Sequence, residues 1–345
     1  MATIEETAMP VDPQPVTRRQ ALGGAAAVAA TVATLSGTRF ALAQDGGSAG
    51  APAKGPLVWL DMDQAALDAA YDQRAYAPAM SEHIVRRNRH NQMALARLAE
   101  PQIWAYGDRP VEKLHVHLTE RGAGLAPVNV FFHGGAWRTG TARARTFMAE
   151  SPINAGAHCV IPDFSFVQDV GGDLAVLGDQ VRRAVAWVYA NAERFGGDPE
   201  RIYISGFSSG GHLAAVVLTT DWPGEFGLPA DFIKGGLVAS GMFDLEPVRL
   251  SSRREYLTIT DESEQALSPQ RHLDQLHAPL ILGYGTRETP EFQRQTRDFY
   301  AAVKAAGKPV ELLVAEGYHH LEVAETLANP YGLLGRALLE QMQLV

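Results

Sequence analysis

The chain has 345 residues, 46% hydrophobic and 20% charged, so it is long enough to bury one large core or two small ones. Its formal net charge is −9 and its basic residues form no dense cluster, which argues against nucleic-acid or anionic-membrane partners. The single cysteine, Cys159, excludes an intrachain disulfide, and no spacing of cysteine and histidine residues predicts a metal site.

The first residues have the layout of an export signal. Arg18 and Arg19 precede a stretch rich in Ala, Val and Gly, and Ala41-Leu42-Ala43 supplies the small residues of a cleavage site. We therefore expect a twin-arginine-type signal peptide over residues 1–43 and a periplasmic or secreted protein. The apolar stretch is too short and too rich in small residues to be a stable membrane anchor. Residues 44–56, rich in Gly, Ala and Pro, are expected to form a flexible linker.

The remaining sequence begins with helical patterns and then alternates between strands and helices. Residues 57–105 are predicted to be an N-terminal helical extension, with helices over 63–72 and 81–98. Residues 244–276 are polar and weakly periodic, and they form a predicted cap-like insertion. The other expected strands are 114–118, 128–132, 159–161, 201–205, 236–240, 280–282 and 310–314, and the other expected helices are 141–155, 173–195, 211–220, 289–306 and 321–342. This alternation predicts one α/β domain over residues 57–345, with a mostly parallel central sheet and helices on both faces.

A Gly-Gly turn follows the buried strand that ends at Phe132. The chain continues as His133-Gly134-Gly135-Ala136-Trp137, and the two glycines let bare backbone N–H groups face a ligand. Donors of this kind stabilise the negative oxygen of a tetrahedral intermediate. We assign Gly134 and Gly135 to a predicted oxyanion hole, with the N–H of Ser209 as a further donor. A structural role that holds the loop is expected for His133.

Residues 206–210 read Gly-Phe-Ser-Ser-Gly and match the nucleophile elbow G-x-S-x-G. The elbow turns a strand sharply into a helix and lifts a serine oxygen clear of the sheet, and the glycines avoid collisions across the turn. A β-branched and aromatic run precedes the motif and an apolar helical pattern follows it, as the motif requires. Ser208 is the predicted nucleophile. Trp137 and Phe207 are predicted to line the substrate pocket, with a packing role as the alternative for each.

A serine hydroxyl needs a general base, and a histidine base needs a carboxylate that holds its tautomer. Glu288 follows the strand over 280–282 and is the predicted acid, with Glu291 as the neighbouring alternative. The predicted base is His320, favoured over His319 because it directly precedes an apolar position that starts a helix. The order serine, acid, histidine is the one expected along the chain for hydrolases built on this elbow.

These motifs together resemble the hormone-sensitive-lipase-like and arylformamidase-like α/β-hydrolases, and more closely bacterial kynurenine formamidases and related small esterases. The resemblance covers roughly residues 60–345 and is carried by 133–137, 197–202, the elbow and 317–321. It implies the α/β-hydrolase fold, with Ser208 as nucleophile and His320 as base. Glu288 occupies a position where the family more often has Asp. Kynurenine formamidase works in the cytoplasm, so with an export signal the resemblance implies the reaction type better than the substrate.

The sequence therefore predicts a serine hydrolase that cleaves a small, aromatic ester or N-acyl bond through a Ser-His-Glu triad and an acyl-enzyme. The expected partner is a small-molecule ester or amide, and no metal or organic cofactor is expected. A general scavenging carboxylesterase is one alternative, and a catalytically silent binding module on the same fold is another. Ester, formamide, carbamate and other amide substrates stay open. So does the oligomeric state, because apolar positions on the N-terminal helices could form a homodimer face or pack on the domain.

Overall fold

An eight-stranded sheet forms the centre of the computed structural model, which describes residues 55–345. The strand order is β10-β9-β8-β7-β5-β6-β4-β3; β5 to β10 are parallel to one another, and β4 runs antiparallel to both of its neighbours, β6 and β3. The strands are β3 (Gln102–Ala105), β4 (Lys113–His117), β5 (Ala126–Phe132), β6 (His158–Pro162), β7 (Gly197–Phe207), β8 (Ile233–Ala239), β9 (Leu280–Gly285) and β10 (Val310–Ala315). The mostly parallel sheet predicted from the alternating pattern is confirmed. The predicted signal peptide lies outside the described residues.

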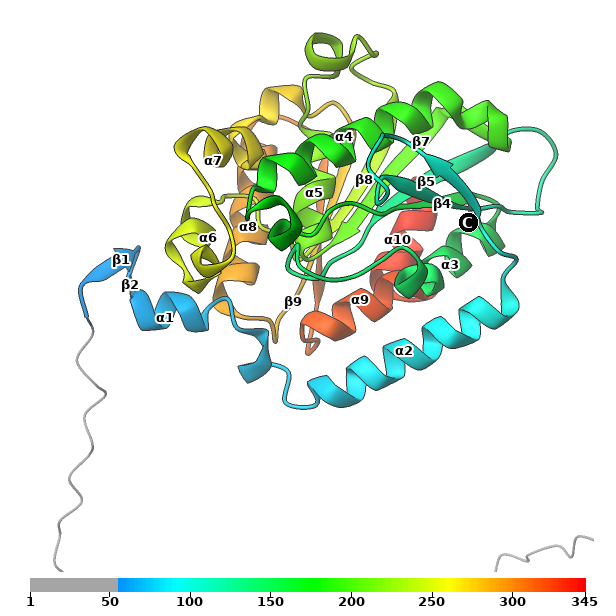
Figure 1. The fold of residues 1–345 in the computed structure, drawn as a ribbon. Helices are drawn as coiled ribbons and strands as arrows, with labels where there is room; N and C mark the ends of the chain where they lie inside the picture. The colour runs from blue at the N-terminus through cyan, green and yellow to red at the C-terminus, as the bar shows by residue number, and fades with distance from the viewer. Residues whose placement is uncertain (1–54) are drawn as a thin grey trace, which may run out of the picture. The chain divides into compact units, whose positions relative to one another are not determined.

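Helices cover both faces of this sheet (Figure 1). One layer contains α4 (Leu174–Asn191), α5 (Ser209–Leu218) and α8 (Pro290–Ala305), whose apolar side chains contribute to the larger core cluster. The other layer contains α3 (Glu150–Ala155), α9 (His320–Ala328) and α10 (Leu333–Gln341), and the second core cluster lies beneath it. All residues of β5, β6 and β9 are buried, because a parallel sheet covered on both faces exposes neither side to water.

The N-terminal extension contains more than helices. Its helices are α1 (Gln64–Ala69) and α2 (Met80–Arg97), and α2 runs alongside α9 (Figure 1). A short hairpin of β1 (Leu57–Trp59) and β2 (Met62–Asp63) precedes α1, and β3 adds an edge strand to the main sheet. The sequence prediction missed these three short strands, since their exposed residues give no periodic apolar signal.

Two predicted helices also differ from the structure. The predicted helix over 321–342 is broken into α9 and α10, because Pro330 lacks an N–H and disfavours helical backbone at the residue before it. The predicted helix over 141–155 begins as a 3₁₀ segment, Arg143–Ala149, and becomes α-helical only in α3. The segment 244–276 contains two short helices, α6 (Glu246–Leu250) and α7 (Asp261–Leu267). Within residues 55–345, no helix is both long and apolar enough to cross a membrane.

Candidate active site

The elbow lies at the carboxyl end of β7, in the middle of the sheet, where β7 turns into α5. Ser208 has φ 60° and ψ −129°, a backbone conformation that costs a non-glycine residue about 1–3 kcal/mol. Its N–H donates to Ala239 O on β8 at 2.9 Å, which helps to hold the turn in place. A side chain at Gly206 would bring its Cβ within 2.7 Å of the Ala214 Cβ on α5. The glycine is therefore required because the strand and the helix approach each other so closely.

The three residues predicted to act together lie in one hydrogen-bonded line. His320 Nε2 is 2.9 Å from Ser208 Oγ, and His320 Nδ1 is 2.8 Å from Glu288 Oε1. Ser208 follows β7, Glu288 follows β9, and His320 begins α9 after β10. The carboxyl ends of parallel strands meet at one edge of the sheet, so side chains more than a hundred residues apart converge there.

Burial and packing fix the orientation of the His320 ring. The Glu288 carboxylate is fully buried and accepts the Nδ1–H of His320, which leaves Nε2 as the acceptor for the Ser208 hydroxyl. The rings of Phe207 and Phe292 pack against the imidazole, with centroids 4.6 and 4.9 Å away. The alternative acid, Glu291, instead forms an ion pair with Arg294 at 2.6 Å. Glu288 is therefore the carboxylate that contacts the base.

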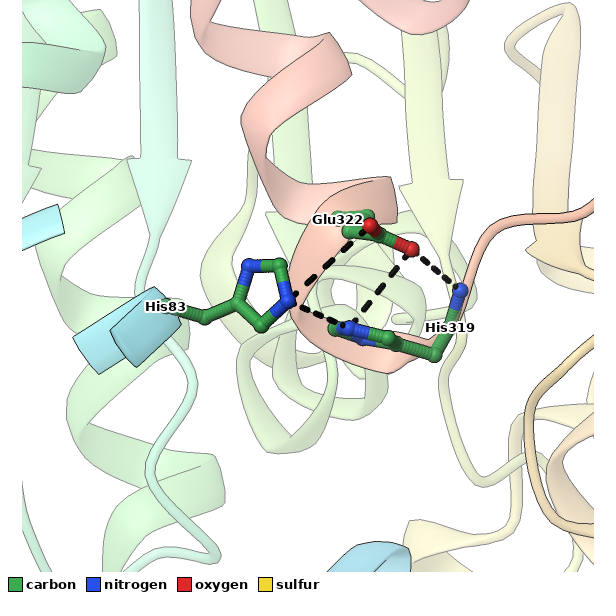
Figure 2. Close-up of side chains that lie close together, drawn as sticks. All are labelled: His83, His319 and Glu322. Atoms are coloured by element: carbon green, nitrogen blue, oxygen red, sulfur yellow. Dashed lines mark hydrogen bonds and ion pairs between the residues drawn. The ribbon is translucent and has the colours of Figure 1, made fainter. Parts of the chain in front are cut away.

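His319, the alternative base, faces His83 and Glu322 (Figure 2). Its Nε2 is 2.9 Å from His83 Nε2 on α2 and 3.5 Å from Glu322 Oε2, while its Nδ1 accepts the N–H of Leu321 at 3.2 Å. His319 is thus the N-cap of α9. Burial lowers the pKa of its imidazole, so the ring is neutral near pH 7.

His83, His319 and Glu322 offer ligand atoms within 4.8 Å of one another, which is close enough to hold a metal ion (Figure 2). The hydrogen bonds around the two rings oppose this role. Arg86 Nη2 lies 2.6 Å from His83 Nδ1 and can only donate, and His319 Nδ1 accepts from a backbone N–H. A metal-bound imidazole keeps a proton on its other nitrogen, and neither the Arg86 guanidinium nor the N–H of Leu321 can accept a hydrogen bond from a protonated Nδ1. The Glu322 carboxylate lies 3.5 Å from His319 Nε2 and 3.9 Å from His83 Nε2, and it accepts the backbone N–H of His319 at 3.0 Å.

The Gly-Gly loop lies directly against the elbow. A Cβ at Gly134 would fall 2.8 Å from both Ser208 Cβ and Phe207 O, so only glycine fits there. Gly135 has φ 144°, and the N–H of Trp137 donates to Ser209 Oγ at 3.2 Å, which ties the loop to the start of α5. Ser209 is the first residue of α5, where an N–H has no acceptor within the helix. The structure therefore brings the three predicted oxyanion residues next to Ser208.

His133 and Trp137, on either side of these glycines, are buried. His133 stacks on Phe164 with centroids 4.6 Å apart, and burial followed by the nearby charge of Arg145 lowers its pKa to about 4. This is consistent with the structural role expected for it. The prediction that Trp137 lines the pocket does not fit the structure. Its φ of 59° turns the chain inward, and the indole packs edge-to-face on His212 of α5 at 5.3 Å.

A cavity of about 550 Å³ opens beside Ser208 and His320. Phe207 lines it, as predicted, together with Phe131, Phe147 and Phe292. The predicted cap-like insertion over 244–276 reaches the cavity, whereas sequence reasoning missed the contribution of the N-terminal extension, which carries no catalytic motif. The cavity residues from these two parts are Tyr71, Gln73, Met80, His83, Arg87 and Arg253.

Two family models and several known proteins match this chain. Residues 114–227 match the BD-FAE family model, and residues 177–331 match that of the Prolyl oligopeptidase family. Kynurenine formamidase of Danio rerio is 29% identical, over 82% of this chain and 98% of its own length. Kynurenine formamidase of Salmo salar is 30% identical, over 69% of this chain and 80% of its own length. The chain belongs to the arylformamidase and esterase group of α/β-hydrolases.

The resemblance stated from the sequence is therefore confirmed. The solved structure of an esterase from Pyrobaculum calidifontis, 18% identical, superposes with a TM-score of 0.62 over 80% of this chain and 95% of its own, and it confirms the fold. The chain is thus an α/β-hydrolase enzyme that acts on ester or amide bonds.

Proposed function

We propose that the chain is a serine hydrolase that cleaves a small aromatic ester or N-acyl bond through an acyl-enzyme. The observation that carries the proposal is the hydrogen-bonded line Glu288–His320–Ser208, which opens onto an aromatic cavity. Relatives named kynurenine formamidase support an N-formyl aryl amide as the first substrate class to test. A substrate of that size fits a cavity of about 550 Å³.

The mechanism follows from the position of each group. Ser208 Oγ attacks the carbonyl carbon while His320 Nε2 takes the hydroxyl proton, and the buried Glu288 carboxylate stabilises the imidazolium that forms. The backbone N–H groups of Gly134, Gly135 and Ser209 hold the oxyanion. When the intermediate collapses, His320 gives its proton to the leaving oxygen or nitrogen. A water molecule, deprotonated by the same Nε2, then attacks the acyl-enzyme and regenerates the Ser208 hydroxyl.

The test compares kcat/KM on N-formylkynurenine and on 4-nitrophenyl acetate for the purified protein and for Ser208→Ala. We expect Ser208→Ala to lower kcat by roughly 10⁴- to 10⁶-fold on every substrate that the protein turns over. A strong preference for the formamide would establish the N-formyl class. A strong preference for the ester would make the chain a general carboxylesterase. Full activity of Ser208→Ala would show that the nucleophile is elsewhere.

The two histidines provide a matched control pair. His320→Asn should lose activity to a similar extent as Ser208→Ala, because it removes the base. His319→Asn should keep kcat within a few-fold of the unaltered protein, because Asn is among the best N-cap residues and can still accept a hydrogen bond at the start of α9. A fluorophosphonate probe that fails to label Ser208 would instead favour a catalytically silent binding module.

A further inference from the structure

The cavity beside Ser208 is rich in positive charge, although the chain as a whole has a net charge of −9. Four arginines line it: Arg87 on α2, Arg138 and Arg145 after β5, and Arg253 in the segment 244–276. Among residues 55–345, no carboxylate forms an ion pair with any of the four. Arg87, Arg145 and Arg253 are half-buried and Arg138 is exposed, so the charges of the first three are only partly solvated.

Arg87 and Arg145 are held close together by the packing of α2 on the 3₁₀ segment Arg143–Ala149. The side chain of Asn91 bonds this segment twice: its Nδ2 donates to Arg143 O at 3.0 Å, and its Oδ1 accepts the N–H of Phe147 at 3.2 Å. Arg87 lies one helical turn before Asn91 on the same face of α2. The two bonds therefore hold Arg87 against the segment that carries Arg145.

The surroundings of Arg87 and Arg145 disfavour the charged form of both side chains. Burial, followed by repulsion from Arg87, lowers the pKa of Arg145 to about 10, and burial lowers the pKa of Arg87. Both side chains still carry a positive charge at neutral pH. Arg145 donates to Ala144 O, and the Nε of Arg87 is buried without a hydrogen-bond partner among the described residues. Two partly desolvated like charges favour a bound anion.

The nearest carboxylate does not fill this role. Glu325 also lines the cavity, but both of its oxygens are bonded by Arg86, at 3.0 Å from Nε and 2.6 Å from Nη2. Arg253, from another segment of the chain, is held over the rings of Tyr71 and Phe292, at 5.2 and 5.9 Å from the centroids, and adds further positive charge. The arginines of the cavity are therefore held in place, and their positive charge is available for a ligand.

We propose that Arg87 and Arg145 form an anion subsite that holds a carboxylate of the substrate while its scissile carbonyl lies at Ser208. The planar guanidinium fork matches the two oxygens of a carboxylate, and two forks provide enough donors for both. The aromatic walls and the volume of the cavity suit an aromatic acid. This inference rests on the proposed function for its reaction, and it adds that the substrate class is acidic.

The kinetic test uses two formamides that differ only in charge, 2-formamidobenzoate and 2-formamidobenzamide. We expect kcat/KM to be at least about tenfold higher for the carboxylate, and Arg87→Gln and Arg145→Gln to lower this ratio by about ten- to a hundredfold. Arg89→Gln removes the same charge from an exposed position of α2, outside the cavity, and should leave the ratio unchanged. A ratio near one, or a ratio that neither cavity variant alters, overturns the subsite.

A binding test separates this inference from the proposed reaction. Calorimetry on Ser208→Ala should show that 2-aminobenzoate binds at least about tenfold more tightly than neutral 2-aminobenzamide, and that adding Arg87→Gln removes the difference. If neither formamide is hydrolysed but this preference is present, the N-formyl substrate class fails and the anion subsite stands. Equal binding of the two ligands overturns the subsite even if hydrolysis is found. Circular dichroism identifies a variant that does not fold, and the other arginine variant then decides.

Discussion

At the scale of single residues, a buried carboxylate sets the state of the proposed base. Glu288 is fully enclosed, and its Oε1 faces the Nδ1 of His320 at 2.8 Å, while its Oε2 has no hydrogen-bond partner among the described residues. A neutral imidazole has one proton to place, and the carboxylate draws it to Nδ1. The lone pair on Nε2 is then directed at Ser208. The reactivity of the serine therefore depends on a residue that does not touch it.

Exchanging Glu288 for Gln should reverse the tautomer of His320 while the volume of the side chain stays almost the same. The amide can present a donor to Nδ1, which favours the tautomer with its proton on Nε2, and it cannot stabilise the imidazolium. We expect Glu288→Gln to lower kcat by about 10⁴-fold, with the fold retained by circular dichroism. Glu291→Gln is the matched control, because Glu291 pairs with Arg294, and it should keep most of kcat. The opposite order of the two variants would assign the acid to Glu291.

The residues that could be predicted from sequence are those whose chemistry imposes a local pattern. Ser208 needs glycines on both sides, and Glu288 and His320 each follow a strand, so all three are visible in the sequence. Arg87 and Arg145 carry no such pattern, since an arginine on an amphipathic helix is normally a solvated residue. Their environment arises only when α2 packs across the 3₁₀ segment. For Trp137 a pocket role and a packing role both stayed open, because a motif cannot show which way a strained loop turns its side chain, and the structure has the packing role.

At the scale of elements, the Gly-Gly loop and the elbow stabilise each other. The loop that follows β5 is bonded to the first residue of α5 through Trp137 and Ser209, and Gly134 packs against Ser208 itself. Ala136, Trp137 and Ser208 all have positive φ, so strained backbone is concentrated where the two segments meet. Strain of this kind persists only because surrounding contacts hold both segments, and it positions backbone donors before a substrate binds.

Adding one methyl group at Gly134 should separate these two segments. In Gly134→Ala the new Cβ would lie 2.8 Å from Ser208 Cβ and from Phe207 O, closer than van der Waals contact allows. We expect kcat to fall by about 10²- to 10³-fold, as when one oxyanion donor is lost, with a smaller change in KM. The matched control is Gly122→Ala, at φ 89° with no atom within 4 Å, which should change stability but not kcat. Unchanged kcat in Gly134→Ala would remove the loop from the proposed hole.

How far the elements could be predicted depends on whether their sequence is regular. Buried parallel strands are continuous apolar runs, and β5 and β9 were expected within a few residues of their observed bounds. Short exposed strands such as β3 have too few residues and too little burial to give a signal. Pro330 is a signal for the break between α9 and α10. One continuous helix was predicted because the apolar pattern continues on both sides of this residue.

At the scale of the whole molecule, the sheet and its helices bury histidines whose rings stay neutral in the folded chain until the pH falls to about 4. Burial lowers the pKa of His117, His133 and His212 to about 4 each. They lie on β4, after β5 and on α5, so three different parts of the core each bury a neutral imidazole. In the unfolded chain each ring has an ordinary pKa of about 6.5. Between these two values the unfolded state binds more protons than the folded state.

The chain should therefore lose stability in mild acid, before most carboxylates are protonated. The free energy of unfolding should be constant with respect to these histidines above pH 6.5, and it should fall as the pH drops from 6.5 toward 4. Each ring contributes about 3 kcal/mol of this loss, and the slope of unfolding free energy against pH corresponds to about three protons. Urea denaturation at a series of pH values measures the slope directly.

One substitution isolates a single histidine in this slope. Both ring nitrogens of His117 are buried without a hydrogen-bond partner among residues 55–345, so His117→Leu removes a titrating group without leaving a donor or acceptor unpaired. We expect this variant to reduce the slope by about one proton, and its stability relative to the unaltered protein to increase as the pH falls below about 6.5. His90→Gln, at an exposed position of α2, should retain the full slope. If His117→Leu kept the full slope as well, proton uptake on unfolding would arise from groups other than this buried histidine.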